Sequence, residues 1–273
     1  MPSFDGLKKL EGIYLASNSL NGKIPYNFLS GLEDKTKPIV VELQGNYLAG
    51  VVPASLTQFD NLDLILNDNR FSGIAPGLCS MSNWLDGAVG AFDCDGLLCP
   101  KDTFSQTGRR ALDKTCLPCP ANSVAPYMGS SKCVSAEAQA IENEREVLKA
   151  MYDSLDGIGW HSQSNWYDDS VSFCDWIGIT CTSDGKSIQS ILLGANGLKG
   201  TLPDVVFDLP NLFELNLSEN EVVINFDYIG SAAKLELLNI DETGVSSLSG
   251  IEGAPALKLL HAGNNMFTSF PQE

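Results

Sequence analysis

The sequence predicts an α/β solenoid in which units of one strand and one return segment stack in two blocks. An asparagine recurs about every 22 to 28 residues within each block, with Thr243 standing at one such position. Each asparagine closes a frame of alternating apolar residues, and the first frame of each block continues as Gly-x-Ile-Pro or Gly-x-Leu-Pro. The asparagines are Asn18, Asn46, Asn69, Asn196, Asn220 and Asn265.

The repeated frame has a physical reason. Successive residues of a strand point to opposite sides, so in Leu-x-Leu-x-x-Asn the leucines face the core and the intervening residues face solvent. The asparagine amide can bond backbone groups that are left open where the strand ends. We therefore expect the asparagines to be structural, and we expect the solvent side of the strands to be the surface that the protein presents.

The continuation from Gly22 to Pro25 resembles the plant-specific class of leucine-rich repeat. That class is found in extracellular receptor ectodomains and polygalacturonase inhibitors. The resemblance implies leucine-rich repeats at residues 1–78, as the end of an array, and at residues 187–273, as the start of an array. Repeats after Pro203 lose the continuation and look like a shorter class.

The composition indicates a folded protein that does not bind nucleic acid. The chain has 273 residues, 44% of them hydrophobic, and a formal charge of −17 from 34 acids and 17 bases. Phosphate backbones repel such a chain, so basic proteins, cations or polyamines are better partners. No stretch approaches the roughly 20 apolar residues of a membrane span, so we expect no membrane insertion. Residues 1–10 lack the hydrophobic run of a secretory leader.

Eight cysteines favour disulfides and therefore an extracellular or cell-surface location. Structural zinc is the alternative, because Cys116 and Cys119 form a C-x-x-C, but no second such pair or nearby histidine completes a ligand set. Sequential pairing of the first six would close three short loops, and it is one of many possible connectivities. The cysteines are Cys79, Cys94, Cys99, Cys116, Cys119, Cys133, Cys174 and Cys181.

Residues 79–134 are expected to form a cysteine-rich module. The pattern C-P-x-x-T-F-S-x-x-G that starts at Cys99, followed by C-x-x-C-P and G-x-x-x-C, resembles the small modules of ephrin-receptor-like extracellular proteins. The segment has too little apolar content for a core of its own, so covalent bridges should hold it together.

Residues 135–186 are expected to form a helical cap of the N-terminal type. Ser135 can cap a helix that carries apolar residues at helical spacing and stops at Gly157. The C-x-W-x-G-I-T-C stretch that follows resembles the N-terminal cap of plant-type leucine-rich repeat proteins. The resemblance implies that the cap covers the first strand of the second array and is locked by a disulfide between Cys174 and Cys181.

Both caps would then lie in the middle of the chain, with open array ends at the termini. An uncapped array end exposes its apolar core and an unpaired strand edge. We therefore expect such ends to stack head to tail, between chains or within a tandem parent, with Phe267 and Phe270 near Phe4, Leu7 and Leu10.

The concave face of the second array is the candidate ligand-binding site. Its acidic character fits either a basic or amide-rich ligand or simply a soluble surface. Calcium held by Asp241 and Glu242 with Glu219 is an alternative that no calcium-loop spacing supports, and we assign neither metal nor cofactor. The candidate residues are Glu214, Asn216, Glu219, Asn239, Asp241, Glu242 and His261.

One glycosylation sequon occurs, Asn216-Leu217-Ser218, although the same residues also follow from the repeat frame. A glycan at Asn216 would stand on the concave face and obstruct protein ligands. Occupancy of the sequon would therefore argue against that face as the binding site.

No catalytic set is found, because neither His161 in the cap loop nor His261 is linked by a motif to a serine or cysteine nucleophile. We predict a non-enzymatic extracellular recognition or adhesion protein that binds a protein, peptide or glycan through its repeats. One alternative is a structural repeat unit of a secreted fibre or cell-wall layer. A second is an inhibitor of a wall-degrading enzyme.

Overall fold

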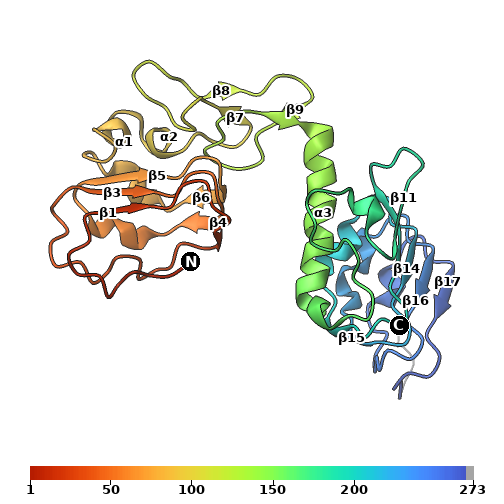
Figure 1. Cartoon of the computed structure of the whole chain (residues 1–273). Coiled ribbons are helices and arrows are strands. Elements are labelled where there is room, and N and C mark those ends of the chain that lie inside the picture. Colours follow the sequence, from red (N-terminus) through yellow and green to blue (C-terminus); the bar gives the residue numbers. More distant parts are fainter. Residues whose placement is uncertain (269–273) are drawn as a thin grey trace. The chain divides into compact units, whose positions relative to one another are not determined.

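The computed structural model describes residues 1–268. The chain forms two compact units, Met1–Gln139 and Ala140–Glu273 (Figure 1). Each unit has one continuous apolar core. Phe4 packs edge-on against Phe28 in the first unit, and Phe267 packs against the core of the second. Phe270, which belongs to the stacking expectation, lies outside the described residues.

The first unit contains a stack of parallel strands. β1, β3 and β5 form one sheet in that order, and a second ladder, β2–β4–β6, follows the asparagines. Val41 pairs in register with Ile13 on one side and Leu64 on the other, so the apolar side chains of three repeats meet in the core. The bounds are Gly12–Tyr14 for β1, Asn21–Gly22 for β2, Ile39–Glu42 for β3, Tyr47–Val52 for β4, Leu62–Ile65 for β5 and Arg70–Ile74 for β6.

The second unit repeats this arrangement with more strands. β12, β14, β16 and β17 are parallel, β11 pairs antiparallel with β12 at the edge, and β13 pairs with β15 in a separate ladder. Within residues 1–268, neither stack closes into a ring. The bounds are Ile179–Cys181 for β11, Ile188–Leu192 for β12, Lys199–Thr201 for β13, Glu214–Asn216 for β14, Glu221–Val223 for β15, Leu237–Asn239 for β16 and Leu259–His261 for β17.

The return segments that are helical are 3-10 helices. They start directly after residues such as Pro53 and Pro203, whose extended backbone ends the preceding ladder. A 3-10 helix rises about 2.0 Å per residue against about 1.5 Å for an α-helix, so a few residues suffice to span the return. The bounds are Ala54–Gln58 for η1, Pro76–Ser80 for η2, Asp204–Asp208 for η5, Phe226–Ser231 for η6 and Ile251–Gly253 for η7.

The asparagines close the strands, which confirms their structural role. Asn46 is 5% exposed, and its Nδ2 donates to the carbonyls of Leu15 and Leu43 at 2.9 and 3.0 Å. Its Oδ1 accepts from the N–H of Leu20 at 3.0 Å. Asn220 joins its repeat to the preceding one in the same manner. The Asn46 and Asn220 amides thus each pair backbone groups of two repeats that would otherwise be buried without partners, and we call this series of positions the asparagine ladder.

The cysteine-rich segment covers the end of the first stack. Trp84 is fully buried, and its indole N–H donates to the Phe59 carbonyl at 2.9 Å. The Phe71 carbonyl in β6 accepts from the N–H of Met128 at 3.0 Å. Backbone groups that a further repeat would pair are therefore paired by this segment.

Disulfides join the cysteines in sequence order. The bridges are Cys79–Cys94, Cys99–Cys116, Cys119–Cys133 and Cys174–Cys181, and no cysteine is free in the described part of the chain. Between the first six, the secondary structure elements are short, and buried residues such as Val89 and Leu97 join the core of the first unit. The bounds are Ala88–Phe92 for α1, Cys94–Leu97 for α2, Thr103–Phe104 for β7, Leu117–Pro118 for β8, Ser123–Val124 for β9 and Val134–Ser135 for β10.

The helix α3 (Ala136–Ser154) leads into the cap of the second unit. The Ser135 hydroxyl accepts a backbone N–H of its first turn at 3.1 Å, as expected for a capping serine. Glu144 is 5% exposed, and its carboxylate accepts from the Ser187 hydroxyl and the Ile188 N–H, each at 2.6 Å. This buried carboxylate fastens α3 to the start of β12.

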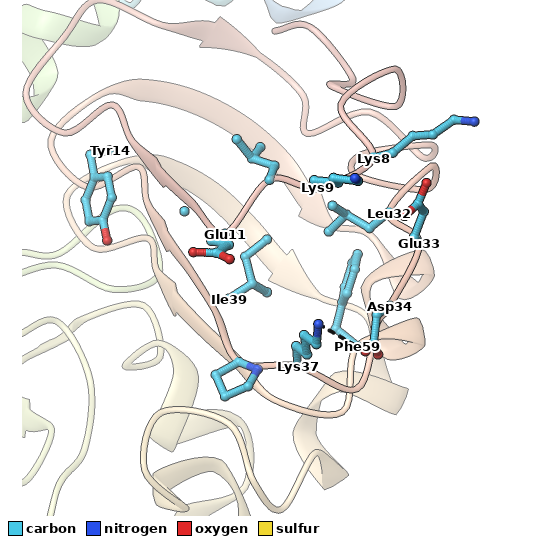
Figure 2. Close-up of a pocket in the computed structure, with 13 residues that line it drawn as sticks. Lys8, Lys9, Glu11, Tyr14, Leu32, Glu33, Asp34, Lys37, Ile39 and Phe59 are labelled. Carbon is cyan, nitrogen blue, oxygen red and sulfur yellow. Dashed lines mark ion pairs between the residues drawn. The ribbon is translucent and has the colours of Figure 1, made fainter.

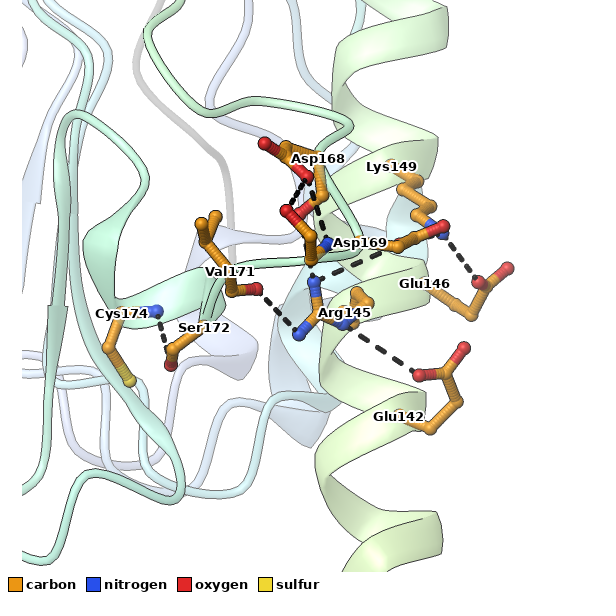
Figure 3. A network of polar contacts seen from close by, with 10 residues as sticks. Glu142, Arg145, Glu146, Lys149, Asp168, Asp169, Val171, Ser172 and Cys174 are labelled. Atoms are coloured by element: carbon orange, nitrogen blue, oxygen red, sulfur yellow. Dashed lines mark hydrogen bonds and ion pairs between the residues drawn. The ribbon is translucent and has the colours of Figure 1, made fainter.

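Figure 3 shows a second contact between α3 and the loop that follows it. Arg145 donates to the Val171 carbonyl at 3.1 Å, and its guanidinium lies 5.6 Å from the ring centre of the buried Trp176. Lys149 lies 2.7 Å from the Asp169 carboxylate. The 3-10 helices η3 (Gly157–Gly159) and η4 (Phe173–Asp175) complete the cap.

An aromatic cluster fills the interior of the cap. The ring centres of Trp160 and Trp166 are 4.7 Å apart, and those of Trp166 and Trp176 are 5.2 Å apart. Tyr167, at the margin of the cluster, donates to the Asp153 carboxylate at 2.6 Å. Burial, together with this hydrogen bond and the nearby carboxylates, raises the pKa of the Tyr167 phenol well above its usual range.

Replacing Asn46 with alanine should lower the free energy of unfolding of the first unit by about 2–4 kcal/mol, because buried backbone groups lose their partners. Asn18 is the matched control, since it is exposed and its amide donates only to carbonyls of its own repeat. Asn18→Ala should cost about 0.5 kcal/mol or less. Urea unfolding and amide hydrogen exchange in β3 measure the loss of stability in both variants. Equal losses for Asn46→Ala and Asn18→Ala would show that the buried asparagine does not join the two repeats.

Glu144→Ala should destabilise the second unit by about 3 kcal/mol, because it leaves the Ile188 N–H buried without an acceptor. The control is Glu142→Ala, which removes a half-exposed carboxylate 3.8 Å from Arg145 and should cost about 1 kcal/mol or less. Amide exchange should accelerate first in β11 and β12. Acceleration confined to the first unit would show that Glu144 does not anchor the cap.

Candidate ligand-binding face

The outward face of the second unit consists of the side chains that β12, β14, β16 and β17 turn away from the core. The strand register places Leu192, Asn216, Asn239 and His261 side by side in one row across the four strands. Three of the seven residues expected from the sequence therefore occupy neighbouring positions. The regular register of the repeats brings them together, although they lie far apart along the chain.

The row nearer the strand starts contains both polar and apolar side chains. Glu214 lies there between Ser190, which is buried, and Leu237, which is half-buried. Leu259 at the end of this row is 54% exposed, and Leu192 in the neighbouring row is 42% exposed. Aliphatic surface is thus exposed close to the Glu214 carboxylate.

The face becomes acidic where the strands end. Glu219 and Glu242 are exposed, and their backbones are left-handed, with φ of 56° and 54°. The same conformation precedes every asparagine or threonine of the ladder and bends the chain out of the strand. Only one of these residues is glycine, so the sequence carried no signal for the bend. They are Ser17, Gly45, Asp68, Ala195, Glu219, Glu242 and Asn264.

The carboxylates of the outward face differ in their partners. Asp241 accepts from the N–H of Gly263 at 2.5 Å, and Glu242 accepts from the side-chain amide of Asn264 at 2.9 Å. Glu214 and Glu219 form no hydrogen bond or ion pair through their carboxylates with any residue that the structure describes. These two are the carboxylates that remain available to a ligand.

No lysine or arginine occupies the outward positions described above. Lys258, which directly precedes β17, is paired with Glu236 at 2.8 Å. His261 is exposed at the end of its row and is the one titratable nitrogen base among the candidate residues. Unpaired carboxylates beside exposed aliphatic groups are suited to a ligand that carries a cation and an apolar group together.

Asn216 sits in the middle of the face with its side chain held in one orientation. Its Oδ1 accepts from the N–H of Ser218 at 3.0 Å and from the Ser218 hydroxyl at 2.8 Å. Its Nδ2 makes no hydrogen bond within the described residues, whereas Nδ2 of the buried ladder residue Asn220 donates to backbone carbonyls. The nitrogen that would carry a glycan is therefore free.

The two histidines are not brought together into a catalytic arrangement. His161 is exposed in the cap loop, where its N–H donates to the Asn196 carbonyl at 2.9 Å, so this residue helps to close the first repeat of the unit. His261 lies on β17. Within the described residues, no group of three or more histidine, cysteine, aspartate or glutamate side chains is placed to hold a metal ion.

A cavity of about 820 Å³ lies in the first unit, between the segments that precede β1 and β3 (Figure 2). Buried side chains of the core, Ile39 and Phe59, line it, and Lys37 is 3.7 Å from Asp34 at its rim. None of the candidate residues contributes to it. Its lining mixes both charges with core side chains and therefore singles out no ligand chemistry.

Comparison with known proteins identifies relatives of the repeats and of the cap. Residues 141–182 match the leucine rich repeat N-terminal domain. Receptor-like protein kinase HSL1 of Arabidopsis thaliana is 36% identical over 59 residues, which cover 22% of this chain and 6% of that protein. Probable LRR receptor-like serine/threonine-protein kinase RPK1 of the same plant is 29% identical over 114 residues, which cover 41% and 20%.

Among solved structures, the PEPR1–AtPEP1 complex matches with a TM-score of 0.38 and 22% identity, covering 45% of this chain and 18% of that one. The chain spans a fifth or less of the length of the two curated relatives named above. None of the described helices combines the length and the apolar content needed to cross a membrane.

The relatives confirm the resemblance that the Gly-x-Ile-Pro frame and the C-x-W-x-G-I-T-C stretch indicated. With the four disulfides, they place the protein outside the cell or at the cell surface. In its repeats and in its disulfide-closed cap, the chain is similar to extracellular leucine-rich repeat proteins of plant type.

Proposed function

We propose that this protein is a non-enzymatic extracellular recognition protein whose outward face binds a peptide or protein segment that is both basic and apolar. The observation that carries the proposal is the pair of carboxylates without partners, Glu214 and Glu219, next to exposed aliphatic side chains and without a cation among the outward positions. Opposite charges steer such a partner and set its orientation, and the exposed leucines add apolar contact.

The middle of the face offers further hydrogen bonds to such a ligand. Asn239 and His261 stand beside Asn216 in register, so an extended segment lying across the strands would meet amide and imidazole groups in succession. Curated relatives are named receptor-like kinases, which supports recognition as the task of the extracellular repeats. A glycan ligand would form hydrogen bonds with the same three side chains, Asn216, Asn239 and His261.

The proposal includes the organisation expected from the sequence. Residues 1–78 would end one array, residues 79–134 would close it, residues 135–186 would open a second array, and residues 187–273 would begin its repeats. Two contacts support this scheme: Met128 pairs with Phe71 at the end of the first stack, and Glu144 pairs with Ile188 at the start of the second.

The binding proposal predicts that charge reversal at the two unpaired carboxylates weakens a basic ligand. A synthetic peptide of alternating lysine and leucine serves as the probe, with a glutamate–leucine peptide as its control. The double variant Glu214→Lys, Glu219→Lys should lose at least about 10-fold in affinity, because attraction becomes repulsion. Glu252→Lys, on the return segment η7, should change affinity by about 2-fold or less.

Fluorescence anisotropy at low and moderate salt measures these affinities, and the attraction should weaken as salt rises. Equal binding of the two peptides by the unaltered protein would contradict the proposal. Concentration-dependent self-association without peptide binding would favour the structural alternative. Binding only to a wall-degrading enzyme would favour the inhibitor.

We also propose Asn216 as a glycosylation site that regulates this face. Protein from a glycosylating host should show a mass shift that an amide-cleaving glycosidase removes and that Asn216→Gln abolishes. Because the glycan would stand among the binding residues, this protein should bind the lysine–leucine peptide at least about 10-fold more weakly than the Asn216→Gln variant. Asn239→Gln, on the adjacent strand and outside any sequon, is the control for the mass measurement and should keep the mass shift. An unshifted mass would exclude glycan regulation and leave the binding proposal standing.

A further inference from the structure

A long loop joins β7 and β8 (Figure 1). It carries a pair of adjacent arginines, Arg109 and Arg110, followed by Ala111 and Leu112. We propose that the Arg110–Ala111 peptide bond is a processing site for an extracellular endoprotease that recognises paired basic residues. This inference is independent of the binding face.

Exposure of the loop supports the proposal. Leu112 is 96% exposed, more than any other large hydrophobic side chain that the structure describes, and Arg110 is also exposed. An apolar side chain projecting fully into solvent contributes nothing to the core. Exposed loop tips are where proteases cut folded domains, because the substrate must be drawn out into an extended strand.

The hydrogen bonds around the bond are mostly local to the loop. Ala111 and Lys114 pair only with each other across a tight turn, at 2.8 and 3.2 Å. The Arg110 N–H donates to the Asp95 carbonyl at 2.7 Å, and its guanidinium lies 4.8 Å from the ring centre of Phe92. The Arg109 carbonyl accepts from the Ser105 and Thr107 hydroxyls at 2.6 and 3.2 Å. Apart from the Asp95 carbonyl and the Phe92 ring, these partners lie within the loop itself, so a protease that engages Arg110 mainly has to release contacts local to the loop.

The chemistry of the pair selects the class of protease. The side chain of Arg109 forms no hydrogen bond or ion pair with the described residues, so its guanidinium is free for an acidic subsite. The chain has one other adjacent basic pair, Lys8 and Lys9. There the residue after the bond, Leu10, packs against the core of the first unit, which resists extraction into a protease cleft.

Cleavage would consume one water molecule, leaving a carboxylate on Arg110 and an ammonium group on Ala111. The two products would stay joined, because the Cys99–Cys116 disulfide spans the bond. Contacts on the near side of the loop, such as Cys99 N–H to the Gly108 carbonyl at 2.7 Å, do not involve the cut residues. The processed protein would thus be a two-chain molecule that separates only on reduction.

The test uses the full chain and a kexin-type endoprotease. On a denaturing gel, the product of the first cut should run as one band without reductant and as two bands with it, residues 1–110 and 111–273. N-terminal sequencing of the second fragment should begin Ala-Leu-Asp-Lys. Arg110→Gln should abolish this cut, and Arg109→Gln should slow it by at least about 10-fold, because one recognition subsite is lost. Lys9→Gln is the matched control and should change the rate by about 2-fold or less.

Thermal unfolding of each variant checks that the fold is intact. A first cut at Lys9 or elsewhere would overturn the proposal. So would an uncut folded chain under conditions in which the reduced, unfolded chain is cut after Arg110. Equal cleavage rates for Arg109→Gln and the unaltered protein would show that the protease recognises a single arginine. That result would also overturn the proposal.

Discussion

The pairing of backbone groups at the strand ends is the constraint on which the rest of this structure depends. At the end of each strand the backbone bends, and the bend leaves N–H and C=O groups without strand partners inside an apolar core. The buried asparagines pair these groups for two repeats at once, as Asn46 does for the Leu15 and Leu43 carbonyls. Where Thr243 replaces asparagine, its hydroxyl donates to the Ile240 carbonyl of its own repeat, and Oδ1 of Asn265 accepts from the backbone N–H groups of Thr243 and Val245.

The same constraint explains what stands at the ends of the stacks. Trp84 donates to the Phe59 carbonyl beyond the last repeat of the first unit. Glu144 accepts from Ile188 before the first repeat of the second, and β11 pairs with the edge of β12. An indole, a carboxylate and an antiparallel strand are chemically unlike, yet each pairs backbone groups that would otherwise be buried at an edge.

The inward residues fill the core, and the asparagine ladder pairs its backbone groups. The outward residues can therefore differ from repeat to repeat without destabilising the fold. In the second unit, exposed leucines lie on the same face as the Glu214 carboxylate, and further carboxylates follow where the strands end. The hydrogen-bond partners of the carboxylates decide which of them are available to a ligand. Asp241 is bound to Gly263 within the protein, whereas the Glu219 carboxylate, carried outward by a left-handed bend, has no such partner in the described structure. A count of acidic positions alone would treat the two as equal.

The sequence by itself determined the features that repeat or are local: the period of the asparagines, the apolar frame, the helix that Ser135 caps and the extracellular character of the cysteines. These follow from contacts within one unit or from a pattern that every unit shares. Only the tertiary structure decided that Glu144 is buried against β12, that Asn216 keeps a free Nδ2, and that the residue before each ladder position is left-handed. Such features depend on one particular pair of residues from different repeats, or on backbone conformations that non-glycine residues adopt only when packing on both sides requires it. No single sequence pattern encodes them.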